Sequence, residues 1–122
     1  MPAPSPGKPV RGSRTGRPLM ALLDLLGRRW ILRVIWELRE ESLGFRALQA
    51  RCERMSPSVL SQRLQDLVEA GIVERDGAGS YRLTVGGRAL LAALQPLHRW
   101  AELWADQRRS QPPEYRRRRT SR

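Results

Sequence analysis

The sequence predicts a mainly α fold with one small β-hairpin, and three observations support that fold class. Apolar residues recur at helical spacing through the middle of the chain. Two short β-prone segments flank an Asp-Gly turn. The proline-rich start and the arginine-rich end are too polar to bury a core. The 122 residues are enough for one domain. We therefore expect an organised domain at 19–107 between disordered basic segments at 1–18 and 108–122.

Two helices begin the predicted domain. The first has leucines at i, i+3, i+4 and i+7: Leu19, Leu22, Leu23 and Leu26. Pro18 suits its first turn and Gly27 its end. The second helix has five apolar residues along one face: Trp30, Ile31, Val34, Ile35 and Leu38. A small strand at 43–45 and a short helix at 46–52 are expected to follow.

A fourth helix is predicted to begin after Ser56. A serine hydroxyl at this position can accept a hydrogen bond from a free backbone N–H, and Pro57 needs no N–H at the first helical position. Gly71 can supply the left-handed conformation that ends the helix. The predicted apolar stripe consists of Leu60, Leu64, Leu67 and Val68.

A hairpin and two further helical segments complete the prediction. Strands at 72–75 and 81–84 enclose the Asp-Gly turn. Thr84 can cap a fifth helix over 85–95, and Pro96 is expected to break or kink it because proline lacks an N–H. Beyond this proline, four apolar residues again recur at helical spacing: Leu97, Trp100, Ala101 and Trp104.

The order of these elements indicates a winged helix-turn-helix, in which the helix after the turn enters the DNA major groove. Here that helix spans residues 57–69. Its apolar stripe is expected to be buried, which leaves hydroxyl, amide and guanidinium groups outside to read bases and phosphates. An ordinary surface helix would also be polar outside, but its place between a turn and a hairpin favours DNA binding. The candidate DNA-contacting residues are Ser56, Ser58, Ser61, Gln62, Arg63 and Gln65. Asp66 and Glu69 are expected toward the far end, where phosphate repulsion is smaller.

The hairpin is the candidate wing. Arg75 and Arg82 flank its turn, and a basic wing commonly contacts phosphates or the minor groove. A solvent-exposed hairpin that only completes the core is an equally good interpretation.

The formal net charge of +11 sits mainly at the two ends of the chain. Residues 1–18 and 108–122 together carry ten of these charges, and residues 19–107 carry one. Such a distribution indicates a polyanionic partner such as double-stranded DNA. A gene rich in G and C would also encode arginine-rich tails, and such tails would simply be solvated without binding a partner. Arg11, Arg14 and Arg17 form either a DNA-contacting arm or a non-specific electrostatic anchor.

Several segments resemble the HxlR family of bacterial regulators. Leu26–Trp30 is similar to that family's "GGKW" element, and Phe45–Leu48 to its "FSEL" element. Tyr81–Arg88 resembles its "YSLTPLGR" segment, and Trp100–Trp104 resembles its closing helix. The most diagnostic match is the stretch SPSVLSQRL at 56–64, which continues to EAGIVER at 69–75. The resemblance covers about residues 19–106.

The resemblance implies a homodimeric regulator whose first and last helices hold the dimer. Apolar stripes at the two ends of the predicted domain agree with that, although Trp100 and Trp104 could instead fill the chain's own core. A two-fold dimer favours a palindromic DNA site. The candidate dimer residues are Leu19, Leu22, Leu23, Leu26, Leu97, Trp100 and Trp104.

Two features depart from the family pattern. The family wing is usually longer and contains prolines, whereas Asp76–Ser80 is short, which puts minor-groove contact in doubt. Many relatives also carry a cysteine just before the first helix, used in some as a redox switch. The only cysteine here is Cys52, on the same predicted helical face as Leu48. We expect it to be a buried small hydrophobe rather than a thiol sensor.

Little in the sequence points to catalysis. His98 and Cys52 are the only residues of their kinds and lie in separate predicted helices. Without a metal-ligand cluster, phosphate loop or nucleophile motif, we expect no enzyme activity, no metal site and no cofactor. No apolar run is long enough to span a bilayer, and the N-terminus lacks the apolar core of a secretory signal. A single cysteine fits a reducing compartment, so a cytoplasmic location with no membrane partner is expected.

Two further functions stay open. The nearly neutral middle of the chain fits a winged helix that binds protein, or one that binds nucleic acid without sequence choice through its basic tails. A ligand-sensing regulator with a pocket near Trp30, Trp36 and the dimer seam is the other. No convergent polar cluster identifies a small-molecule effector.

Overall fold

The computed structural model describes residues 3–6 and 17–110. The chain divides into two compact units, Met1–Leu91 and Ala92–Arg122. Most of the two predicted basic segments, including Arg11 and Arg14, lies outside the described residues.

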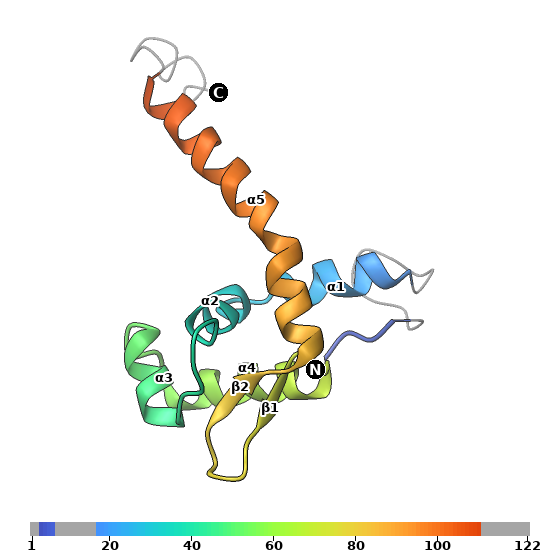
Figure 1. Cartoon of the computed structure of the whole chain (residues 1–122), viewed down its shortest axis with the longest axis vertical. Coiled ribbons are helices and arrows are strands. Elements are labelled where there is room, and N and C mark those ends of the chain that lie inside the picture. The colour runs from blue at the N-terminus through green and yellow to red at the C-terminus, as the bar shows by residue number, and fades with distance from the viewer. Residues whose placement is uncertain (1–2, 7–16, 111–122) are drawn as a thin grey trace. The chain divides into compact units, whose positions relative to one another are not determined.

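The predicted order of elements is confirmed, except at residues 43–45 and at Pro96 (Figure 1). The helices and strands are α1 (Pro18–Leu26), α2 (Ile31–Glu37), α3 (Phe45–Arg51), α4 (Pro57–Glu69), β1 (Val73–Arg75), β2 (Tyr81–Leu83) and α5 (Val85–Ser110). Most boundaries agree with the sequence-based ones to within one residue, because capping residues and turns act locally.

The core of the first unit lies where α2 packs against α1, α3 and α4. The side chains that meet there are the apolar stripes expected from the sequence: Ile31, Val34 and Ile35 of α2, Leu48 of α3, and Leu60, Leu64 and Leu67 of α4 are all fully or nearly fully buried. Burying one such side chain stabilises the fold by about 1.5–3 kcal/mol. This core therefore holds α4 in place with its opposite face toward solvent.

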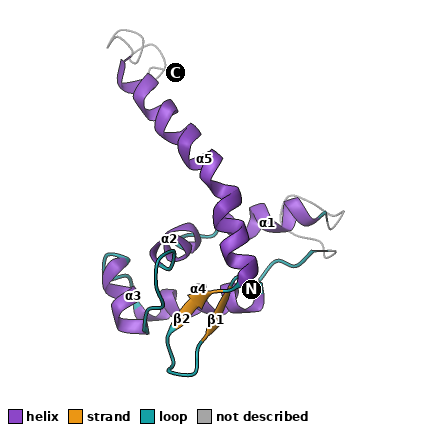
Figure 2. Ribbon diagram, in the orientation of Figure 1, coloured by secondary structure: helices purple, strands orange, loops and turns teal. Residues whose placement is uncertain are grey.

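The two strands form an antiparallel hairpin that follows α4 directly (Figure 2). Val73 pairs with Leu83, and Arg75 with Tyr81. The small strand expected at 43–45 is reduced to one bridge, in which Leu43 and Tyr81 exchange two backbone hydrogen bonds of 3.0 and 2.8 Å. This bridge attaches the hairpin to the segment before α3.

The start of α5 is tied to the end of α4 by Thr84. Its hydroxyl accepts a hydrogen bond from the Gly87 N–H at 2.9 Å and donates to the Gly71 carbonyl at 2.6 Å. Gly71 has φ +77°, the left-handed conformation predicted for it. A Cβ at Gly87 would lie 2.1 Å from the Ile72 carbonyl oxygen, so only glycine permits this approach of helix to backbone.

Of the break or kink predicted at Pro96, the break is wrong, because α5 continues without interruption to Ser110. Proline cannot donate to the carbonyl four residues earlier, which belongs to Ala92. Ala92 and Pro96 are both solvent-exposed, so water can satisfy the carbonyl that the helix leaves without a donor. The helix also runs three residues past the end expected at residue 107.

Candidate nucleic-acid interface

The turn that joins α3 to α4 has an unusual backbone. Glu53 and Arg54 both adopt left-handed φ values, +57° and +56°, which non-glycine residues rarely adopt. The turn is closed by a hydrogen bond from the Arg54 N–H to the Gln49 carbonyl, and the Gln49 side chain donates to the Met55 carbonyl at 2.9 Å. These bonds set the direction in which α4 leaves the turn.

Ser56 caps α4 as predicted. Its hydroxyl oxygen accepts a hydrogen bond from the Val59 N–H at 3.2 Å and lies 3.3 Å from the Ser58 hydroxyl. Pro57 occupies the first helical position, where a missing N–H costs nothing. The Ser56 side chain therefore has a structural role in addition to the DNA contact predicted for it.

The face of α4 opposite the leucine stripe is exposed along the first turns of the helix. Ser58, Ser61 and Gln65 are open to solvent, as predicted. Val68 was expected in the buried stripe, but 45% of it is exposed. Asp66, two residues earlier, is buried beside the leucine stripe instead.

The expectation that Asp66 lies on the outer surface is wrong, because Asp66 is 0% exposed. Two other candidates, Gln62 and Arg63, are only half-exposed because their side chains turn toward this carboxylate. Gln62 donates from Nε2 to Asp66 Oδ1 at 3.1 Å, and Arg63 Nη1 lies 3.6 Å from Oδ2. The apolar periodicity does not reveal this cluster, because an aspartate on a helix is usually exposed.

A buried carboxylate requires a compensating charge, and Asp66 has two arginines beside it. The nearer is Arg28, from the turn between α1 and α2, whose Nη1 lies 3.2 Å from Oδ2. Neither arginine meets Oδ2 with hydrogen-bond geometry, and the buried Nε of Arg63 has no hydrogen-bond partner in the described part of the chain. The attraction at this oxygen is therefore mainly between charges, while Oδ1 holds the directional bond from Gln62.

The wing arginines both engage side chains of the hairpin. The Arg75 guanidinium lies 5.3 Å from the ring centre of Tyr81, and Arg82 Nε lies 3.0 Å from Glu74 Oε1. Asp76 shapes the turn by accepting hydrogen bonds from the N–H groups of Ala78 and Ser80 at 2.9 Å. Both arginines stay exposed, so their predicted contact with DNA stays a prediction.

The candidate dimer residues divide into exposed and half-buried ones. Leu19 and Leu23 of α1 are exposed, whereas Leu22 and Leu26 are half-buried within the first unit. In the second unit, Leu97, Trp100 and Trp104 are all more than half exposed, and the two indole rings stack with centres 6.0 Å apart. Leu103 is equally exposed and was missed, although it follows Trp100 by three residues.

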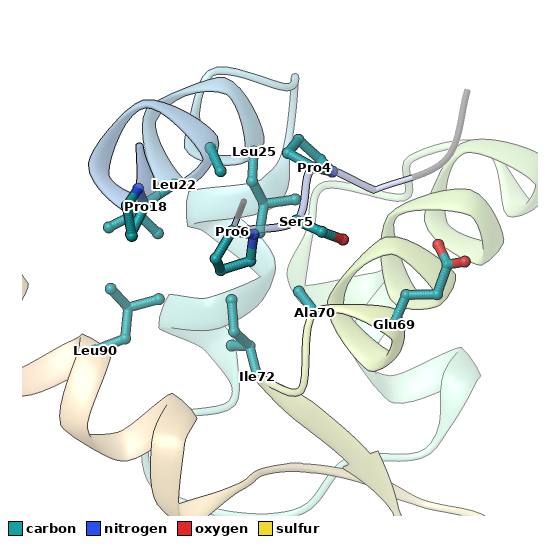
Figure 3. Close-up of a pocket in the computed structure, with 11 residues that line it drawn as sticks. Pro4, Ser5, Pro6, Pro18, Leu22, Leu25, Glu69, Ala70, Ile72 and Leu90 are labelled. Carbon is teal, nitrogen blue, oxygen red and sulfur yellow. The ribbon is translucent and has the colours of Figure 1, made fainter. Parts of the chain in front are cut away.

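A cavity of about 290 Å³ lies within the first unit (Figure 3). Ala21, Leu22 and Leu25 of α1 line one side, and Glu69 at the end of α4 provides a carboxylate at another. Neither Trp30 nor Trp36 lines this cavity, so the effector pocket expected near them stays a prediction.

Cys52 is fully buried in the core, as expected for a small hydrophobe. Burial raises the pKa of its thiol above the ordinary value, although the charge of nearby Arg33 acts in the opposite direction. A neutral, enclosed thiol is a poor nucleophile.

Residues 3–6 and 17–110 contain no helix long and apolar enough to cross a membrane. Within the same residues, no group of three or more histidine, cysteine, aspartate or glutamate side chains could hold a metal ion.

Comparisons with known proteins agree with this geometry. Residues 25–109 match the family model described as HxlR-like helix-turn-helix. The uncharacterized HTH-type transcriptional regulator YvaP of Bacillus subtilis is 33% identical over 90 residues, which are 69% of this chain and 83% of that protein.

Solved structures share the fold as well. Quinone-bound YodB from B. subtilis matches with a TM-score of 0.65 and 32% identity, over 70% of this chain and 94% of the other. A protein from Thermoplasma volcanium, described as a possible HxlR family transcriptional factor, matches with a TM-score of 0.61 and 28% identity over 70% and 82% of the two chains. With its turn, its capped helix α4 and its hairpin in this order, the chain belongs to the HxlR-like helix-turn-helix family of DNA-binding transcription regulators.

Proposed function

We propose that the protein is a sequence-specific regulator that binds a palindromic operator as a homodimer, with α4 of each subunit in the major groove. The observation that carries the proposal is the exposed side of α4. Ser58, Ser61 and Gln65 present hydroxyl and amide groups from a helix that the core holds rigidly on its other side. Such groups discriminate base edges in the major groove.

The homodimer is supported by apolar side chains that residues 3–6 and 17–110 leave exposed. Leu19 and Leu23 form such a surface on α1, and Leu97, Trp100 and Trp104 form one on α5. Exposed aromatic and aliphatic side chains that gather on one stripe commonly mark an interface between subunits. In a two-fold dimer the two copies of α4 would face half-sites about one helical turn of DNA apart.

The wing and the basic tails supply contacts of a different kind. Arg75 and Arg82 lie on the exposed hairpin, where they are suited to phosphate oxygens. The tails carry most of the net charge of +11, which favours binding to any nucleic acid sequence. A transcription regulator acts in the compartment that holds the DNA, so we propose a cytoplasmic location.

Binding to the DNA upstream of the protein's own gene tests the proposal. Fluorescence anisotropy would be measured at two salt concentrations, with an excess of random-sequence DNA as competitor. We expect binding that survives the competitor, because base contacts add to the salt-dependent phosphate term. Binding that disappears under both treatments would assign the affinity to the basic tails and leave the non-specific function as the better one.

Variants of α4 separate base contacts from stability. Arg63→Ala and Gln62→Ala are unsuitable alone, because both side chains support the buried Asp66. Gln65 is exposed, so Gln65→Ala should leave folding unchanged and weaken specific binding by about 1–3 kcal/mol if it pairs with a base. Deletion of residues 108–122 is the matched control, since it should lower the affinity for all sequences alike.

A further inference from the structure

We infer that Asp66 is a positioning residue for DNA recognition, which orients the Gln62 amide so that Gln62 presents its carbonyl oxygen to a base amino group. The inference rests on the proposed function, because it assigns a chemical preference to one residue of the same helix face. Asp66 is buried, accepts a hydrogen bond from Gln62 and has two arginines beside it. Gln62 itself lies on the side of α4 that carries the exposed hydroxyls.

The Asp66 carboxylate is held firmly by two neighbouring positive charges. Asp66 is fully buried, and Arg28 Nη1 stands 3.2 Å from Oδ2, with Arg63 Nη1 at 3.6 Å. Arg28 belongs to the turn between α1 and α2, whereas Arg63 belongs to α4 itself. The carboxylate is therefore held by one charge from its own helix and by one from another segment of the chain. Oδ1 is therefore presented to the Gln62 side chain in one orientation.

The amide of Gln62 can meet this carboxylate with only one of its two ends. A glutamine side chain has an NH₂ end that donates and a carbonyl end that accepts. The carbonyl oxygen would be repelled by a carboxylate, so the 3.1 Å contact with Asp66 Oδ1 must come from Nε2. Since Nε2 is turned inward, Oε1 is the end that can accept a hydrogen bond from outside.

The outward Oε1 of Gln62 can accept only from a donor group, which limits the bases that it can read. Gln62 is half-exposed and follows Ser61, on the side of α4 that carries the exposed hydroxyls. In the major groove, the amino groups of adenine and cytosine donate, whereas the keto oxygens of guanine and thymine accept. A fixed acceptor on Gln62 selects adenine or cytosine on the strand that it faces. A freely rotating glutamine could match either kind of base edge.

The experiment selects binding sites from random-sequence DNA with the full-length protein and compares three variants with the wild type. Asp66→Asn keeps the shape of the side chain but no longer dictates which end of the Gln62 amide turns inward. Gln62→Met keeps the length of the side chain and removes both of its polar ends. Glu69→Gln removes a charge from the same helix, away from the cluster, and serves as the matched control.

We expect Asp66→Asn and Gln62→Met to lose about tenfold discrimination at the same base-pair position of each half-site, with the other positions unchanged. Glu69→Gln should keep every preference. A base analogue without its exocyclic amino group, placed at that position, should weaken wild-type binding and leave Gln62→Met unaffected. A merely structural role for Asp66 would lower affinity for all sequences together and would not single out one position.

Several outcomes would overturn the inference. If Gln62→Met retains every preference of the wild type, Gln62 reads no base, and this result holds even where Asp66→Asn fails to fold. If the two variants lose different positions, or if the amino-free analogue binds the wild type as well as the natural base does, the orientation argument is wrong. A wild-type protein that enriches no sequence at all would instead refute the proposed function itself.

Discussion

The segment from α1 to Leu91 and the segment 92–110 show the same apolar periodicity but opposite burial. In the first, Leu60 and Leu64 are 0% and 2% exposed, because α2 and β1 pack against α4. In the second, Leu97 and Trp104 are more than half exposed. Periodicity thus predicts a helix and its apolar face in both segments, but it does not predict which surface packs against that face. For the α4 stripe the partner is the chain itself, and for the stripe of the second segment we propose a second subunit.

The same leucine-to-alanine substitution in each segment tests this comparison, and the one in the first segment should have the largest effect. Leu60→Ala removes a fully buried side chain and should lower the free energy of unfolding by about 2–5 kcal/mol. The loss should be the same at every protein concentration, because the cavity lies inside one subunit. Chemical denaturation at two concentrations measures it.

Leu97→Ala is the matched variant in the second segment. Its leucine is 61% exposed, so it should hardly affect the folding of a single subunit. Any stabilisation that it removes should come from the dimer and should vanish on dilution. Sedimentation velocity of this variant and of Trp104→Ala should show a shift from dimer to monomer, and an unchanged dimer in both would refute the proposed interface.

A second test concerns the connection at the start of α5. Gly87→Ala would place a Cβ against the Ile72 carbonyl oxygen, so we expect a loss of about 1–3 kcal/mol in the free energy of unfolding. Gly86→Ala meets nothing closer than 3.7 Å and should be neutral or stabilising by up to about 1 kcal/mol. Thermal melts of both variants measure this difference. Equal melting temperatures would mean that the close approach of Gly87 to the Ile72 carbonyl does not constrain the fold.

The smallest expected effect concerns the thiol in the core. The pKa of Cys52 is raised by burial, so its contribution to stability is fully present below the ordinary thiol pKa of about 8.5. That contribution is lost as the pH rises through the raised, folded-state value. The wild type should therefore lose more stability between neutral and alkaline pH than Cys52→Ala does. Rapid alkylation of the native protein by iodoacetamide at pH 8 would contradict the burial of the thiol.

Local patterns predicted much of the fold, as the ends of α4 illustrate. The Ser56 cap, the proline after it and the left-handed Gly71 all have the roles expected from the sequence. Each depends on backbone groups within a few residues, so neighbouring residues suffice to predict it. Pro96 shows the limit of such rules, since an exposed proline did not stop a helix that continues on both sides of it.

The candidate site was predicted less completely than the fold. Ser58, Ser61 and Gln65 are exposed as the helical period requires. Gln62 and Arg63 are not fully exposed, because Asp66 draws them inward. The spacing of residues along α4 cannot reveal this cluster, since an aspartate on a helix is ordinarily solvated.

The sequence by itself therefore determined most of the order of the elements and their caps, because these depend on periodicity and on short-range hydrogen bonds. It also determined the family, because the segments at 56–64 and 69–75 resemble that family residue by residue. Only the tertiary structure decided that Asp66 is buried, because that depends on Arg28, which reaches it from a turn far away in the sequence. A buried charge is stable only beside its partner, and the fold brings that partner to it.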